Sequence, residues 1–128
     1  MTGLNLSGTT HTNAGPYTDS WTFTDVTGNY NNDSGSVSDT IDKAAPSCSV
    51  TGYSVTYDGN PHTATGSCTG VLSEVLSGLD LSGTTHTNAG SYLADPWTFT
   101  DVTGNYNNAG GSLNDTIAKA EPSCSVTG

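Results

Sequence analysis

A tandem internal repeat constrains the fold of this chain more than any other feature of its sequence. The segment LSGTTHTNAG occupies residues 6–15 and recurs at 81–90, and WTFTDVTGNYNN occupies residues 21–32 and recurs at 97–108. The offset is 75 residues for the first block and 76 for the second, because one residue is inserted between them. Segments this similar are typical of neighbouring modules in an array, so we expect one small fold, repeated.

A third shared segment, PSCSVTG, begins at Pro46 and again at Pro122. Each copy follows a strand-like run and a short Lys- and Ala-containing stretch, which is typical of a joint between modules. The expected organisation is a truncated preceding repeat at 1–45 that lacks its first hairpin, a complete repeat at 46–121, and the first strand of a following repeat at 122–128. The sequence leaves open a rival phasing with boundaries near Leu4 and Leu79.

Composition allows only a thin apolar core. Thr, Ser, Asn and Gly supply 65 of the 128 residues, whereas Leu, Ile, Val and Phe supply 20. Such a composition also occurs in disordered chains. Charged residues make up only 11% of the chain, however, and the aromatic residues stand in alternating segments. We therefore expect a small all-β fold.

The charge balance excludes two classes of partner. The formal net charge is −10, and Lys43 and Lys119 are the only Lys or Arg residues. A chain with so few cations cannot neutralise nucleic-acid phosphates or bind an anionic membrane surface. No apolar run approaches the length of a bilayer span or of a signal-peptide core. We expect neither nucleic-acid binding nor membrane insertion.

Short strand patterns alternate with Gly- and Asn-rich turns along the complete module. Residues 53–57 alternate, 58–61 form a turn cluster and 62–65 resume the pattern, which predicts a β-hairpin. Further strands are expected at 81–87, 97–102 and 112–117. This spacing predicts a small immunoglobulin-like β-sandwich for each repeat.

Two tyrosines occupy a motif with a structural meaning. Tyr17 and Tyr92 each follow Asn-Ala-Gly and one further residue. This pattern resembles the tyrosine corner of immunoglobulin-like domains, in which the hydroxyl bonds back to the backbone a few residues upstream. The alternative is a turn followed by an ordinary strand tyrosine.

Two aromatic pairs are candidate core residues, Trp21 with Phe23 and Trp97 with Phe99. The members of each pair are two residues apart, so they face the same side of one strand. That spacing favours a core face over a carbohydrate-stacking platform.

The cysteines indicate an oxidising compartment. Cys48 and Cys68 flank the predicted hairpin and can meet across it if a bulge near Gly52 adjusts the register. We predict a disulfide between them, and hence a location outside the cytosol. Cys124 repeats the position of Cys48, so it is expected to be unpaired or intermolecular. No second Cys or His lies at metal-ligand spacing, which disfavours the alternative of a metal site.

No catalytic constellation is evident. His11 and His86 share one repeat position and, like His62, are interpreted as surface histidines. Neither a Ser-His-Asp spacing nor a glycine-rich phosphate loop is present. The acidic residues are dispersed and form no calcium-binding loop, although weak structural calcium at the joints is an alternative. We expect a non-enzymatic protein without a cofactor.

As a set, the motifs resemble the YDG/MBG-type repeat modules of long bacterial surface and secreted proteins. The segments that carry the resemblance are VTYDG at 55–59, HTATG at 62–66, LSGTTHTNAG at 81–90, WTFT at 97–100 and GNYN at 104–107. The resemblance implies an extracellular, β-rich tandem repeat of the adhesin or stalk kind, with no enzymatic activity and no ligand residues to transfer. It leaves open a β-grasp fold, which would place a helix at residues 71–79.

The expected function is therefore a spacer that extends a surface adhesin, stalk or filament by stacking repeats. The alternative is a module that binds glycans or a host surface through exposed Tyr and Trp side chains. Buried positions for Trp97 and Tyr106 would favour the spacer. The expected partners are neighbouring repeats or other copies of the chain, with the strand at 122–128 adding head-to-tail to the incomplete repeat at 1–45.

Overall fold

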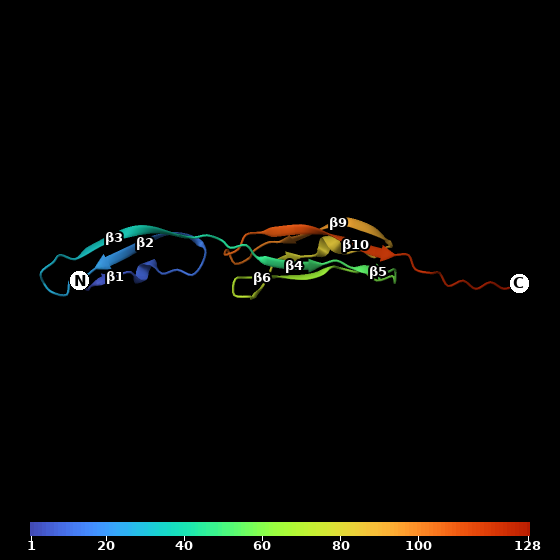
Figure 1. The fold of residues 1–128 in the computed structure, drawn as a ribbon, viewed down its shortest axis with the longest axis horizontal. Coiled ribbons are helices and arrows are strands. Elements are labelled where there is room, and N and C mark those ends of the chain that lie inside the picture. Colours follow the sequence, from blue (N-terminus) through green and yellow to red (C-terminus); the bar gives the residue numbers. More distant parts are fainter. The chain divides into compact units, whose positions relative to one another are not determined.

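The computed structural model describes all residues from Met1 to Gly128, and the chain is all-β. Its helical content is limited to two short 3-10 turns. The chain forms two compact units (Figure 1), and the division between them falls between Ala44 and Ala45, beside the joint expected from the sequence. The first unit comprises Met1–Ala44 and Thr103–Tyr106, and the second comprises Ala45–Val102 and Asn107–Gly128.

The first unit contains one antiparallel sheet with the strand order β1-β2-β3. Its strands are β1 (Leu4–Asn5), β2 (Gly15–Phe23) and β3 (Asp33–Ile41), and the 3-10 turn η1 (Ser7–Thr9) links the first two. The β2–β3 register is continuous from the Gly15–Ile41 pair to the Phe23–Asp33 pair.

The second unit repeats this sheet and adds a fourth strand. Its order is β5-β10-β9-β8. The strands are β5 (Ser54–Thr56), β8 (Leu79–Asp80), β9 (Gly90–Phe99) and β10 (Ala109–Ala118), and η2 (Ser82–Thr84) takes the place of η1. The added strand β5 runs parallel to β10, whereas the other pairs are antiparallel.

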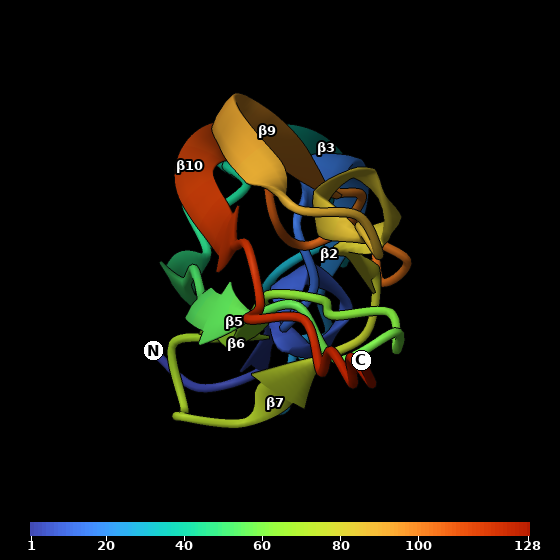
Figure 2. The same cartoon turned by 90° about the vertical axis from the view of Figure 1, so that its right-hand side faces the viewer.

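A second, smaller sheet completes the second unit. It has the order β4-β6-β7, from strands β4 (Ser47–Thr51), β6 (Thr65–Thr69) and β7 (Val75–Leu76). Figures 1 and 2 show β9 and β10 on one side of the unit and β6 on the other. The largest fully buried side chains include Phe99, Ile117 and Thr84 of the larger sheet and its η2 turn, together with Cys68 of the smaller one. The unit is therefore a small β-sandwich-like fold with a thin core, as the composition predicted.

The predicted hairpin at 53–65 is wrong in its pairing. The strand β5 does not pair with residues 62–65 but joins the other sheet beside β10. The strand β6 pairs instead with β4 and with β7, and Cys48 of β4 lies directly opposite Cys68 with no bulge in the ladder. Because β5 belongs to the larger sheet, β4 pairs directly with β6, and the two cysteines are in register without a bulge near Gly52.

Three further expectations need correction. Residues 71–79 contain a turn and the two short strands β7 and β8, so the helix that a β-grasp fold requires is absent. The strand expected at 81–87 is occupied instead by the 3-10 turn η2. Residues 122–128, expected to be a strand, are exposed and belong to no strand.

The inserted residue of the second repeat forms a β-bulge. Leu113 lies opposite Asp95 and Asp115 lies opposite Tyr92, so β9 uses two residues where β10 uses one. Ala94 sits in this bulge at φ 62°, and its N–H donates to Asn114 Oδ1 at 3.1 Å. The bulge absorbs the extra residue locally, so the strand keeps the same faces on either side of it.

Candidate functional site

Each unit contains the same cluster: an aspartate and a tyrosine on a long strand, β2 or β9, and a histidine from the segment that precedes this strand. In the second unit, Nε2 of His86 lies 2.8 Å from Oδ2 of Asp95. The His86 ring stacks on the Tyr92 ring, with centroids 3.5 Å apart. His11, Asp19 and Tyr17 repeat the arrangement in the first unit, with 2.7 Å for the hydrogen bond and 3.6 Å for the stack.

The prediction that both histidines are surface residues is wrong, and the residue pattern alone did not identify this cluster. His11 and His86 are instead half-buried, stacked and hydrogen-bonded. The sequence did contain a signal for this pairing. Asp19 follows His11 by eight residues, and Asp95 follows His86 by nine because the second repeat has one inserted residue. In each repeat the buried aspartate and the half-buried histidine are hydrogen-bonded to each other, as is usual for buried polar groups.

A second carboxyl group completes the cluster. Asp115 of β10 is fully buried, and its Oδ2 atom has no hydrogen-bond partner. Burial, followed by the hydrogen bond and the charge of Asp95, raises the pKa of Asp115, although the hydrogen bond from the Tyr53 N–H opposes the shift. In the first unit, a side-chain hydrogen bond with Asp19 and then burial raise the pKa of Asp39.

Tyr53 ties the segment before β5 to the larger sheet. Its N–H donates to Asp115 Oδ1 at 2.9 Å, and its hydroxyl donates to the Thr84 carbonyl at 2.7 Å. Burial, then the nearby carboxylates of Asp115 and Asp95, raise the pKa of the Tyr53 phenol. The cluster in the second unit thus joins β9, β10, η2 and the segment that enters β5.

The two candidate tyrosine corners have the expected hydrogen bond. The hydroxyl of Tyr92 donates to the Asn88 carbonyl at 2.6 Å, and that of Tyr17 donates to the Asn13 carbonyl at 2.5 Å. Each bond closes the turn that leads into a long strand, so the tyrosines have a structural role.

The candidate core aromatics differ between the two units. Phe99 is 1% exposed, and Trp97 beside it is half-buried. Their counterparts Phe23 and Trp21 are both half-buried. Trp97 leans over the backbone of its cross-strand partner Gly111, where a Cβ would lie only 2.9 Å from the indole nitrogen.

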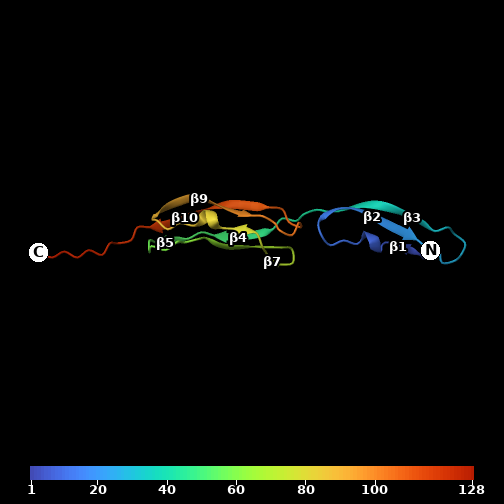
Figure 3. The ribbon, with the colours of Figure 1, turned by 180° about the vertical axis from the view of Figure 1, so that it is seen from behind.

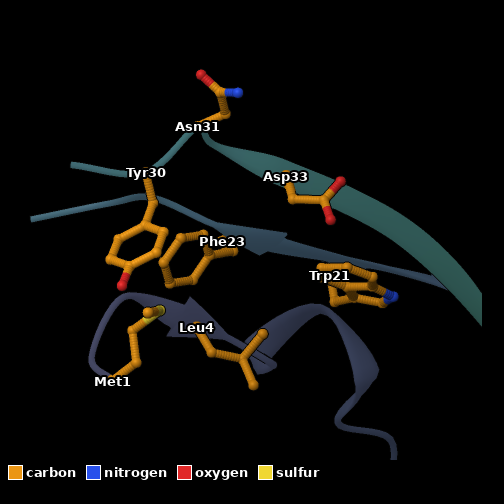
Figure 4. Close-up of a pocket in the computed structure, with 7 residues that line it drawn as sticks. All are labelled: Met1, Leu4, Trp21, Phe23, Tyr30, Asn31 and Asp33. Atoms are coloured by element: carbon orange, nitrogen blue, oxygen red, sulfur yellow. The ribbon is translucent and has the colours of Figure 1, made fainter. Parts of the chain in front are cut away.

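The aromatic face of the first unit lines an open groove of about 470 Å³. Figure 4 shows the Tyr30 and Phe23 rings and the Met1 and Leu4 side chains pointing toward one another, whereas Asn31 points away. Trp21 and Asp33 line the remainder. Leu4 is 57% exposed and Tyr30 is 58% exposed, so this face is apolar and open to solvent.

The predicted disulfide is present. Cys48 and Cys68 are bonded across β4 and β6, and Cys68 is fully buried. Cys124 is free and exposed. Closing a loop of this size contributes about 3 kcal/mol in the chain-entropy model, which is substantial for a thin core.

No group of three or more His, Cys, Asp or Glu side chains is placed to hold a metal ion. His62 lies 3.0 Å from Asp58 in the turn after β5, where the N–H of Asn60 and then His62 lower the pKa of that carboxyl. None of the helices is long or apolar enough to cross a bilayer. The acidic side chains described above are bonded within their own units rather than gathered around an open site.

Comparison with known proteins gives no relative: no family model, no curated protein and no solved structure matches this chain.

Proposed function

We propose that this chain is a non-enzymatic structural repeat that acts as a spacer in an extracellular bacterial surface protein, such as an adhesin, stalk or filament. The resemblance to YDG/MBG-type modules suggested this function, and the internal duplication supports it. An array of identical modules is a common way to build length, because each module contacts only its neighbours.

The observation that carries the proposal is the path of the chain through the complete module. Figures 1 and 3 show that the chain enters the second unit at one end, through β4, and leaves at the opposite end, after β10. A module with its entry and exit at opposite ends adds its own length each time it is repeated. The ten residues of β10 span about 33 Å at the usual rise per residue.

The use of the polar and aromatic side chains supports a structural role over ligand binding. The histidine and aspartate side chains of the repeated cluster bond to each other, and the corner tyrosine bonds to the backbone. Trp97 is half-buried and Tyr106 is buried, so neither provides the exposed aromatic platform that glycan binding requires. This disfavours the alternative of a glycan-binding module.

An extracellular location is part of the proposal. The Cys48–Cys68 disulfide supports it, because such bonds persist mainly in oxidising compartments. The low content of cations and the net charge of −10 would keep neighbouring copies soluble and apart.

The spacer function can be tested by lengthening the chain. One or two further copies of residues 46–121 would be inserted before Pro46 of the full chain, and the maximum dimension measured by small-angle X-ray scattering. We expect an increase of about 30–40 Å per added repeat, from the strand length. A maximum dimension that does not grow with repeat number would refute the spacer. Specific binding to a glycan array that is lost in Tyr57→Ala would favour the alternative.

A further inference from the structure

The two units expose the same sheet face to different degrees. Leu4 pairs with Phe23 in the first unit, as Leu79 pairs with Phe99 in the second. Yet Phe99 is 1% exposed and Leu79 is half-buried, whereas Phe23 is half-buried and Leu4 is 57% exposed. Since the strands match, the difference must come from what covers them.

In the second unit, the cover is the segment that runs from β4 to β7. Besides the two hydrogen bonds of Tyr53, the N–H of Ala64 donates to Thr84 Oγ1 at 2.9 Å. Ala64, Leu76 and the disulfide-bonded Cys68 of this segment are buried. The segment therefore supplies apolar side chains and three specific N–H or O–H donors, one to β10 and two to Thr84 of the η2 turn.

The first unit carries the acceptors for the same donors. Thr9 and Asp39 occupy the repeat positions of Thr84 and Asp115. The Thr9 hydroxyl donates to the Leu6 carbonyl at 2.7 Å, as the Thr84 hydroxyl donates to that of Leu81, so the two threonines are held in the same way. No backbone N–H of the first unit donates to the carboxylate of Asp39. Its open face is thus a preformed copy of the face that is covered in the second unit.

We propose that this face of the first unit, lined by Leu4, Trp21, Phe23 and Tyr30, is a docking site for a disulfide-closed segment with the sequence of residues 46–77, supplied by another repeat of the same kind. The counterpart of Tyr53 would donate to Asp39 and to the Thr9 carbonyl, and that of Ala64 would donate to the Thr9 hydroxyl. The counterpart of β5 would extend the sheet beside the end of β3. This interaction stands on the internal repeat and does not depend on the spacer function.

The exposed tail at 122–128 lacks most of the segment that covers this face in the second unit. It matches only residues 46–52, which end before Tyr53 and β5. The strand that it resembles, β4, pairs with β6 and not with the larger sheet. Head-to-tail addition of the tail alone would therefore leave the hydrogen-bond acceptors of the first unit unpaired, and a longer segment is the better occupant.

The test is complementation in trans. An oxidised synthetic peptide of residues 46–77 would be titrated into the full chain by isothermal calorimetry, and binding followed through Trp21 fluorescence in the Trp97→Phe chain. We expect one peptide per chain and a blue shift of the Trp21 emission, because the peptide would cover the aromatic face.

Two matched pairs of variants make the test specific. In the peptide, Gly52→Val should weaken binding at least tenfold, because a Cβ at Gly52 lies only 2.7 Å from a carboxylate oxygen and 2.9 Å from a backbone carbonyl of β10 in the second unit. The control peptide Leu72→Ser changes a side chain that is 86% exposed and should bind normally. In the chain, Phe23→Ser should weaken binding, whereas Val26→Ser, at a position 69% exposed and outside the groove, should not.

The outcomes distinguish the occupants of the face. Absence of binding, or binding that is equal for the normal and Gly52→Val peptides, would overturn the proposal. Dimerisation of the chain without peptide, disrupted by Phe23→Ser, would also overturn it by identifying a second copy of the face itself as the occupant.

Discussion

The imidazole ring of His86 lies parallel to the phenol ring of Tyr92, with 3.5 Å between centroids and 4° between planes. The hydroxyl of the stacked Tyr92 donates to the Asn88 carbonyl, and Nε2 of His86 is hydrogen-bonded to Asp95. The first repeat has the same geometry between His11 and Tyr17, at 3.6 Å and 8°. A polar cluster used in this way stabilises a turn and the start of a long strand in each repeat.

Removing the hydroxyl of the stacked tyrosine should destabilise the chain. We expect Tyr92→Phe to lower the free energy of unfolding by about 1 kcal/mol, because the Asn88 carbonyl loses its partner while the ring stack remains. Urea denaturation followed by circular dichroism measures the change. Tyr57→Phe, at a ring that is 43% exposed, is the control and should have no effect. Equal stabilities for the two variants would show that the tyrosine corner contributes nothing.

The buried carboxyl pair should make stability depend on pH. Burial and Asp95 raise the pKa of Asp115 above its ordinary value of 3.8, so the folded state holds this proton more tightly than the unfolded state. The stability from this group is complete below pH 3.8 and is lost as the pH rises through the raised pKa. The side chain in Asp115→Asn stays neutral at every pH. As the pH rises, the free energy of unfolding of this variant should therefore increase relative to that of the unmodified chain.

A second aspartate provides a control of opposite sign. The side chain and then the N–H of Ser82 lower the pKa of Asp80, so its contribution is present above pH 3.8 and is lost as the pH falls through the lowered pKa. Asp80→Asn should therefore lose stability relative to the unmodified chain as the pH rises from about 3 to 7. Denaturation curves across that range measure both variants. Parallel pH profiles for Asp115→Asn and the unmodified chain would contradict the role of the carboxyl pair.

The bulge in β9 offers a stabilising substitution. Ala94 adopts φ 62°, a conformation that costs a residue with a Cβ about 1 kcal/mol and costs glycine nothing. We expect Ala94→Gly to raise the free energy of unfolding by about 0.5 kcal/mol, after the larger entropy of glycine in the unfolded chain is subtracted. Ala89→Gly, at a residue without positive φ, should be neutral or destabilising. Destabilisation by Ala94→Gly in thermal denaturation would contradict the strain.

The disulfide can be tested by alkylation. Iodoacetamide added to the native chain without reductant should label Cys124 alone, because Cys48 and Cys68 are bonded and Cys124 is free and exposed. Peptide mapping by mass spectrometry identifies the labelled residues. After reduction and unfolding, all three should react, which checks that each peptide is detected. Labelling of all three cysteines without reductant would remove the support for an oxidising compartment.

Local pattern was enough to predict the strand class, the disulfide and the tyrosine hydrogen bonds. Alternating residues set the two faces of a strand whatever its partner is, so Trp97 and Phe99 were correctly placed on one face. The hairpin prediction failed because β5 satisfies its backbone by pairing with β10, which follows about 60 residues later in the sequence. No pattern within residues 53–65 distinguishes that distant partner from a neighbouring strand.

The sequence by itself determined that this protein is a tandem repeat of all-β modules, because two nearly identical segments with the same alternation must fold alike. Only the tertiary structure decided what each histidine does and which face is open. His86 reads as a surface residue until β9 folds back and brings Tyr92 and Asp95 against it. Phe23 and Phe99 lie in identical local sequence, yet Phe99 is buried and Phe23 is only half-buried. The extent of burial depends on the segment that covers each strand and not on the strand itself.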